Sequence, residues 1–401
     1  MNKKLKMILI CIVLLAICVA FTFGQPSMLR YGNRAGCYGF HNVAVGPSPH
    51  FASWHRISTD PVLILDNRYQ FRFPAQHWLQ LQILDPVTGE IVRDLEFPIR
   101  SNINTFALAD GEDVIAIARG HWIDESGELL LFDLETDNPP KNLTAIERTG
   151  FVMWHPNEKV LATIYYPKGY DQGSNIVALY DVNDTNPVQT DTFRLKRVAI
   201  NRFLGWSNNA DVIAVSQLDS VGEIPYFIFL EKGQIEKSLY HESHHHCVTN
   251  GQWSPQEPIL AFSGTNTETE GWDIFLEAVA SPDRADRSLI NLTNTSGEDE
   301  LHPIWSPDGN RVAYVKVYLD AADNRRQELF VIDLNDATYT PIQLTDTLDG
   351  PADKPVWLSD DEIAYLSWSL TEHTWSLKNV SLVERESRKI MDIPQVWYKE
   401  P

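Results

Sequence analysis

The sequence is poor in cysteine, which excludes a small fold stapled by several disulfides. Its 401 residues include four cysteines, and two of them, Cys11 and Cys18, lie in an apolar N-terminal stretch. Cys37 and Cys247 remain, and whether they pair stays open. One bridge cannot be the framework of so long a chain, so packing must supply its stability.

The chain also lacks an excess of basic residues. It has 33 Lys and Arg against 54 Asp and Glu, a formal net charge of -21. The acidic residues are spread along the chain, as on a soluble acidic surface. Nucleic acids and anionic membranes attract basic surfaces, so we expect neither as a partner. Contact with a membrane is expected only through the N-terminus, if that segment is not removed.

Three common functional motifs are missing. The sequence contains no G-x-S-x-G nucleophile elbow and no G-x-x-x-x-G-K-[ST] phosphate loop, and C-x-x-C is absent too. An α/β-hydrolase and a P-loop nucleotide-binding protein are therefore not indicated.

The one long apolar run lies at the N-terminus. Three lysines precede the 17 residues from Met7 to Phe23, which is the pattern of an export signal. We expect cleavage before Gln25 or Phe21, so that residues 1–24 form a signal peptide. The run also reaches the lower limit for a membrane-spanning helix, and an uncleaved anchor is the alternative. Both interpretations place the rest outside the cytoplasm, periplasmic or secreted, because the lysines stay inside.

Convincing helical segments are lacking downstream, and a short β pattern repeats instead. A Trp comes directly before a turn and an apolar strand at five places, 52, 47, 52 and 52 residues apart: Trp154, Trp206, Trp253, Trp305 and Trp357. Ala107 is expected in the same slot one unit earlier, and Trp54 is a poorer match. A third strand often ends in apolar-Asp-apolar, and a fourth often precedes Leu-Thr.

A repeat of about 50 residues with four short strands is typical of a β-propeller. The sequence therefore predicts an all-β fold with seven four-stranded blades over residues 50–401, after an N-terminal segment, 25–49. Six blades plus an N-terminal extension is the alternative. We expect each Trp to fill the wedge between two blades, where an aromatic side chain buries a large apolar area.

The repeats "WSPDG", "VAYV", "ELFVIDL" and "IQLT" resemble those of the TolB-type β-propeller family. The resemblance covers roughly residues 100–394 well and 50–99 weakly, and it implies the fold. TolB itself also has an α/β domain before a six-bladed propeller, for which about 25 residues after the signal leave no room. The role of TolB is therefore not transferred to this chain.

Polar residues gather before three of the tryptophans, at the expected mouth of the central channel. The segment "YHESHHHCVTNGQW" holds His244, His245 and His246, and the two following units contribute Asp299, His302 and Asp353. These six are the candidate binding residues. Histidines and carboxylates are possible ligands of a divalent metal, but neighbouring residues of an extended strand face opposite ways, so at most two of the three histidines converge. We assign no metal and no cofactor.

These features favour a binding or scaffold module of the cell envelope over an enzyme. A ring of blades presents rigid loops to a protein or polymer ligand at one rim, and function usually sits on such loops. The alternative is a propeller hydrolase or lyase with a metal or carboxylate site at the channel mouth. The sequence names no ligand, and the fold alone does not supply one.

Overall fold

The computed structural model describes residues 52–393 with interruptions, and all of these residues belong to one compact unit, residues 40–401. The interruptions are short segments of the chain: 58–59, 72–75, 100–102, 110–113, 120–127, 134–140, 143–148, 166–174, 183–187, 196–198, 219–221, 244–246, 267–270 and 347–349. The expected signal or anchor, residues 1–24, and the segment 25–49 lie outside the described residues.

Five sheets each consist of four consecutive antiparallel strands. The first two are β1 (Ala52–Ile57), β2 (Asp60–Phe71), β3 (Gln76–Leu84) and β4 (Ile91–Ile99), then β5 (Ile103–Leu108), β6 (Val114–Arg119), β7 (Glu128–Asp133) and β8 (Lys141–Asn142). The next two are β9 (Thr149–Trp154), β10 (Val160–Tyr165), β11 (Asn175–Asp181) and β12 (Val188–Leu195), then β13 (Ala199–Trp206), β14 (Val212–Leu218), β15 (Glu223–Phe229) and β16 (Gln234–Lys237). The fifth is β25 (Ala352–Ser359), β26 (Glu362–Trp368), β27 (Trp375–Ser381) and β28 (Ser387–Ile393).

A sixth sheet has eight strands, in two sets of four. The sets are β17 (Val248–Trp253), β18 (Ile259–Asn266), β19 (Gly271–Val279) and β20 (Arg287–Asn291), and β21 (Asp299–Trp305), β22 (Arg311–Leu319), β23 (Arg325–Asp333) and β24 (Ile342–Gln343). A single parallel pair, Trp272 with Asp299, joins β19 to β21. The helices of the described residues are two short 3₁₀ turns, η2 (Leu239–Ser243) and η3 (Arg284–Asp286).

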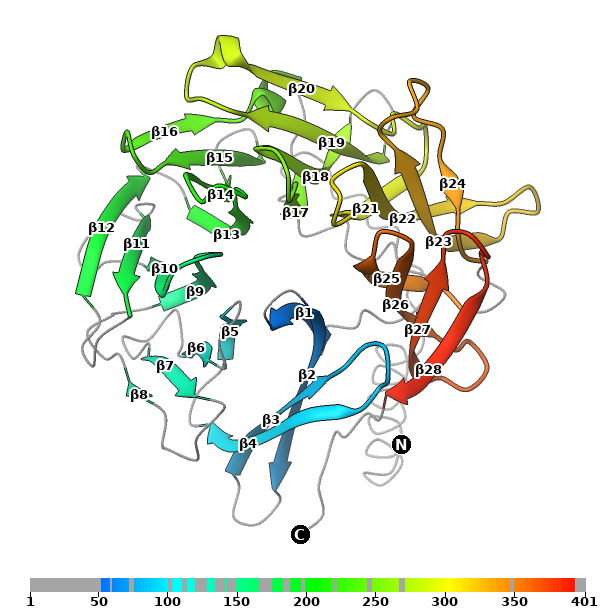
Figure 1. Ribbon diagram of the computed structural model, residues 1–401, viewed down its shortest axis with the longest axis horizontal. Helices are drawn as coiled ribbons and strands as arrows, with labels where there is room; N and C mark the ends of the chain where they lie inside the picture. Colours follow the sequence, from blue (N-terminus) through cyan, green and yellow to red (C-terminus); the bar gives the residue numbers. More distant parts are fainter. Residues whose placement is uncertain are drawn as a thin grey trace, which may run out of the picture. The chain divides into compact units, whose positions relative to one another are not determined.

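The strands follow one another around a central axis (Figure 1). The first strand of each four contacts the first strand of the next, in the order β1, β5, β9, β13, β17, β21 and β25. β25 also contacts β2, which closes the ring. This arrangement is a β-propeller, so the predicted all-β class and propeller fold are confirmed. Within the described residues, no helix is long and apolar enough to cross a membrane.

The repeated tryptophans join neighbouring sheets, as the sequence predicts. In three of the five, the ring N–H donates to a backbone carbonyl on the first strand of the preceding set: Trp154 to Ala107 at 3.0 Å, Trp305 to Gln252 at 3.2 Å and Trp357 to Ile304 at 3.2 Å. All three indoles are buried. One side chain therefore fills the wedge and satisfies a backbone acceptor as well. The ring N–H groups of Trp206 and Trp253 are buried without a hydrogen-bond partner among the described residues.

The expected place of Ala107 in this pattern is wrong by one residue. Trp154 pairs with Leu161 and Trp305 with Val312, seven residues on in each case, and the same offset connects Leu108 to Ile115. Leu108, buried at the end of β5, is thus the counterpart of the tryptophans. A shift of one residue along a strand moves a side chain to the opposite face.

The segment "WSPDG" forms a tight turn, as the sequence predicts. The Gly309 N–H donates to the Ser306 carbonyl at 2.9 Å, which closes a β-turn with Pro307 and Asp308 at its corners. Gly309 has a φ of 73°, a conformation that glycine adopts without a steric penalty. The Ser306 hydroxyl accepts the Arg311 N–H at 2.9 Å and so fixes the strand that leaves the turn.

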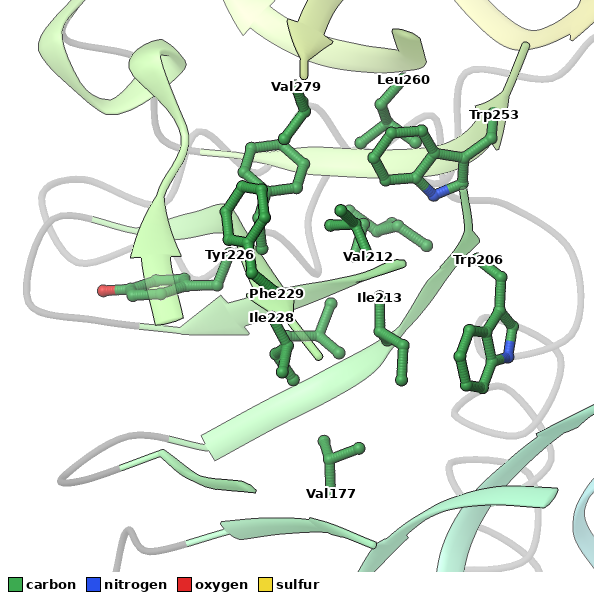
Figure 2. Packing of buried hydrophobic residues seen from close by; sticks show 14 of the residues in the cluster. Val177, Trp206, Val212, Ile213, Tyr226, Ile228, Phe229, Trp253, Leu260 and Val279 are labelled. Carbon is green, nitrogen blue, oxygen red and sulfur yellow. The ribbon is translucent and has the colours of Figure 1, made fainter. Parts of the chain in front are cut away.

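The core consists of apolar clusters between adjacent sheets rather than one central mass. The largest lies among β10–β19, where Trp206 and Trp253 stand beside Val212 and Leu260 (Figure 2). A smaller cluster packs Leu63 and other β2 and β3 side chains on the last sheet, β25–β28. Burial between blades thus stabilises both the ring and its closure.

Candidate functional site

Three successive innermost strands, β17, β21 and β25, carry the same irregularity. The residue three places before the Trp has a left-handed backbone, with φ of 50° at Asn250, 55° at His302 and 44° at Lys354. The pairing with the second strand shifts at these points. Each of the three is therefore the extra residue of a β-bulge, which bends a strand and re-aims a side chain.

This backbone conformation costs energy for any residue with a Cβ, about 1–2 kcal/mol. Glycine would remove that cost, yet the three positions hold Asn, His and Lys. Strain of this kind collects where a side chain is needed in a fixed direction. All three are half-buried on strands that border the axis. The bulges therefore mark these strands as the candidate functional site.

His302 and Asp353 meet across the joint between β21 and β25. His302 Nε2 lies 3.5 Å from Asp353 Oδ1, with side-chain exposures of 29% and 8%. Asp353 Oδ1 also accepts the backbone N–H of Lys354 at 2.7 Å. Two of the six predicted residues are thus in contact, and the carboxylate also holds the bulge in place.

Lys354 lies beside this pair. Burial lowers the pKa of its ammonium group, and the nearby Asp353 carboxylate opposes the shift. A desolvated ammonium group is stabilised by an anion placed next to it. Sequence reasoning missed Lys354 and Asn250. The available signal was a polar residue followed by Gly or Pro, three places before the Trp: "NGQW", "HPIW" and "KPVW".

Asp299 lies at the joint between β19 and β21. Its Oδ1 accepts the Trp272 N–H at 3.2 Å, at the single parallel pair that joins β19 to β21. Burial raises the pKa of this carboxyl. Asp299 and His302 both lie on β21 itself, whereas the sequence placed them in the segment before it. Among the described residues, no three His, Cys, Asp or Glu side chains are arranged to hold a metal.

Next to Asp299, Glu300 is buried in the same joint. Its Oε1 accepts the Thr295 hydroxyl at 2.5 Å and lies 3.8 Å from Lys316 Nζ, while Lys316 also pairs with Glu298. Its Oε2 has no hydrogen-bond partner among the described residues. Burial raises the pKa of Glu300 to about 8, so the group is largely protonated at neutral pH.

The histidine segment is anchored at both ends, although His244, His245 and His246 lie outside the described residues. Buried Tyr240 donates from its hydroxyl to the Cys247 carbonyl at 3.0 Å or the Thr265 carbonyl at 2.8 Å. Glu277 accepts the Leu239 N–H at 2.8 Å and the Ser238 hydroxyl. Tyr240 and Cys247 thus close a loop, and Cys247 is disulfide-bonded.

The same segment contains a motif that sequence reasoning missed. His241, Glu242 and His245 match H-E-x-x-H, in which two histidines share one face of an α-helix and bind zinc. Here Leu239–Ser243 is a 3₁₀ helix, in which residues three apart share a face, not four. The described helix therefore does not reproduce the helical context of that motif. His241 Nδ1 lies 2.6 Å from the Ser238 carbonyl, which leaves Nε2 as its basic nitrogen.

No family model matches the chain, and no curated protein matches its sequence. Its structure is similar to the β-propeller domain of the trilobed protease from Pyrococcus furiosus, at 12% identity and a TM-score of 0.53, covering 85% of this chain and 98% of that one. It is also similar to a prolyl endopeptidase, at 13% identity and a TM-score of 0.58, of which it spans about half, 49%, with 84% of this chain covered. TolB from Acinetobacter baumannii matches at 13% identity and a TM-score of 0.44, with 83% and 80% covered. Likeness at these identities shows the β-propeller fold.

The strain at the bulges gives a direct test. Asn250→Gly should raise the free energy of unfolding by up to about 1 kcal/mol, because glycine adopts the left-handed conformation without steric cost. Asn335→Gly is the control, since Asn335 is exposed and its backbone is not left-handed; it should be neutral or destabilising. Urea unfolding of both variants measures the difference. A destabilised Asn250→Gly would mean that the asparagine side chain holds the fold together.

Proposed function

We propose that this chain is an exported or membrane-tethered β-propeller that binds a protein or polymer ligand at one rim and has no catalytic activity. Residues 1–24 would be the signal or anchor, 25–49 an N-terminal segment and 50–401 the propeller. In this proposal, β17–β20 and β21–β24 are separate blades, and the propeller has seven blades. The N-terminal signal pattern supports an extracytoplasmic location, periplasmic or secreted.

The observation that carries the proposal is the set of bulged inner strands. Asn250, His302 and Lys354 occupy equivalent places on three neighbouring strands, at an energetic cost that glycine would avoid. His302, on β21, contacts Asp353, on β25. The histidine segment lies between β16 and β17, directly before the innermost strand that precedes β21 around the ring. A ligand at this rim could contact residues from several strands at once, which suits a protein surface or an extended polymer.

The histidine segment is tested by replacing His244, His245 and His246 with Ala. We expect the free energy of unfolding to change by less than about 0.5 kcal/mol, because Tyr240 and Glu277 still anchor the segment. Capture of the ligand from native cell-envelope extract by the immobilised chain should weaken. Equal capture by wild type and variant would move the site away from these histidines.

A metal-dependent hydrolase is the second candidate, and the H-E-x-x-H match favours it. Purified protein, never exposed to chelator, should contain less than stoichiometric zinc if the binding function is right. Bound zinc together with a turnover that His241→Ala abolishes would support the hydrolase instead.

A further inference from the structure

Hydrogen-bond donors occupy four consecutive innermost strands. Arg202 lies on β13, Asn250 on β17, His302 on β21 and Lys354 on β25, and these strands border the axis in Figure 1. The arrangement does not extend to β9, where Phe151, three residues before Trp154, packs in the core. One side of the inner ring is therefore rich in donors.

The two carboxylates in contact with these donors, Glu223 and Asp353, already have partners. Glu223 accepts the Ser216 hydroxyl at 2.7 Å and lies 3.5 Å from Arg202 Nε. Asp353 accepts the Lys354 N–H and faces His302. These two carboxylates are thus already engaged by groups of the chain itself.

Two of the donors have capacity beyond the contacts they make. Arg202 Nη1 donates to Thr249 at 3.1 Å and Nε faces Glu223, and a guanidinium has five N–H groups. No hydrogen bond joins the Asn250 amide to another described residue, and the left-handed backbone, with a φ of 50°, sets the direction of its Cα–Cβ bond. This amide, half-buried on an inner strand, can therefore donate to an outside acceptor.

We infer that this side of the inner ring binds the carboxylates of an acidic polypeptide segment, with Arg202, Asn250, His302 and Lys354 as donors. Donors on separate strands, spaced around a ring, suit successive side chains of an extended chain better than one compact anion. The formal charge of -21 repels such a segment elsewhere, so the donor-rich side would also select its binding position. The inference rests on the proposed binding function and names its ligand class.

The test uses the full chain and a fluorescein-labelled peptide, Glu-Gly-Glu-Gly-Glu-Gly, with a matched peptide that has Gln in place of Glu. Fluorescence anisotropy should show binding of the Glu peptide and none of the Gln peptide. Asn250→Asp keeps the size of the side chain and its tolerance of a left-handed backbone, but it places a carboxylate among the donors. We expect at least a tenfold loss of affinity.

Asn294→Asp is the matched control. Asn294 also has a positive φ, 46°, and the substitution adds the same charge in the segment between β20 and β21. Its affinity for the Glu peptide should equal that of wild type. Equal losses in both variants, or no binding of the Glu peptide, would overturn the inference.

The experiments separate the inference that the ligand is acidic from the proposal that the chain binds a ligand at all. Saturable capture of an envelope ligand, together with no peptide binding, would overturn only the acidic-segment inference. Absence of any saturable ligand would overturn the proposed function. The two arms therefore give separate answers.

Discussion

Trp357→Ala should lower the free energy of unfolding by about 3–5 kcal/mol, the usual cost of removing a buried aromatic side chain. Trp357 is 2% exposed and fills the wedge between β21 and β25. Its ring N–H also satisfies the Ile304 carbonyl at 3.2 Å, so truncation would leave a cavity and lose that donor.

Trp357→Phe separates the two contributions. Phenylalanine keeps much of the apolar volume but has no N–H, so we expect a smaller loss, about 1–3 kcal/mol. Val383→Ala serves as a surface control, because Val383 is 78% exposed and should contribute little. Urea unfolding of the three variants gives the comparison. A change below about 1 kcal/mol for Trp357→Ala would contradict the wedge role.

Glu300→Gln should increase stability at pH 9 and leave it nearly unchanged at pH 4. Burial raises the folded-state pKa of Glu300 to about 8, whereas an unfolded glutamate titrates near its model value of 4.5. The folded state therefore binds a proton more tightly than the unfolded state. Stability contributed by this group is fully present below about pH 4.5 and falls as pH rises to about 8.

Glutamine cannot ionise, so the variant lacks this loss and should gain a few kcal/mol over wild type at pH 9. Glu277→Gln is a second test, because burial raises the pKa of Glu277 to about 7. The stability that protonated Glu277 contributes should therefore be lost by about pH 7, one unit lower than for Glu300. Unfolding at several pH values measures both. A stability difference between Glu300→Gln and wild type that stays constant from pH 4 to 9 would show that Glu300 does not titrate as described.

The fold was predictable from the sequence because its repeat is long and regular. Five tryptophans near the ends of first strands, with Ser-Pro-Asp-Gly-like turns after them, recur at almost constant spacing. The error at Ala107 arose because Leu108 stands where the other units have Trp. Without the Trp, the turn could be aligned with Ala107 or with Leu108, and only the pairing of Leu108 with Ile115 shows which side chain lies on the face of the tryptophans. Trp54 matches the repeat poorly because β1 continues to Ile57, so this residue is not at the strand end.

The candidate site was predictable only in part. Acidic and histidine residues before Trp305 and Trp357 were evident, and His302 and Asp353 do meet. The directions of these side chains depend on β-bulges, however. A bulge changes which face of the strand the following side chains point to, so the simple in-and-out alternation of a strand does not predict them. Asn250 and Lys354 were missed for this reason, and Asp299 points into the joint with Trp272 instead.

The most direct test of the binding function is capture of the native ligand by a variant altered at the contact between β21 and β25. His302→Ala combined with Asp353→Asn removes the imidazole and the charge but keeps an oxygen for the Lys354 N–H. Full-length wild type and the double variant are immobilised, checked for equal folding by circular dichroism, and titrated with the purified captured ligand. We predict saturable binding to wild type and an affinity at least about tenfold lower for the variant. Equal affinities would contradict a binding site on the inner strands, and turnover of the ligand by wild type would contradict a purely binding role.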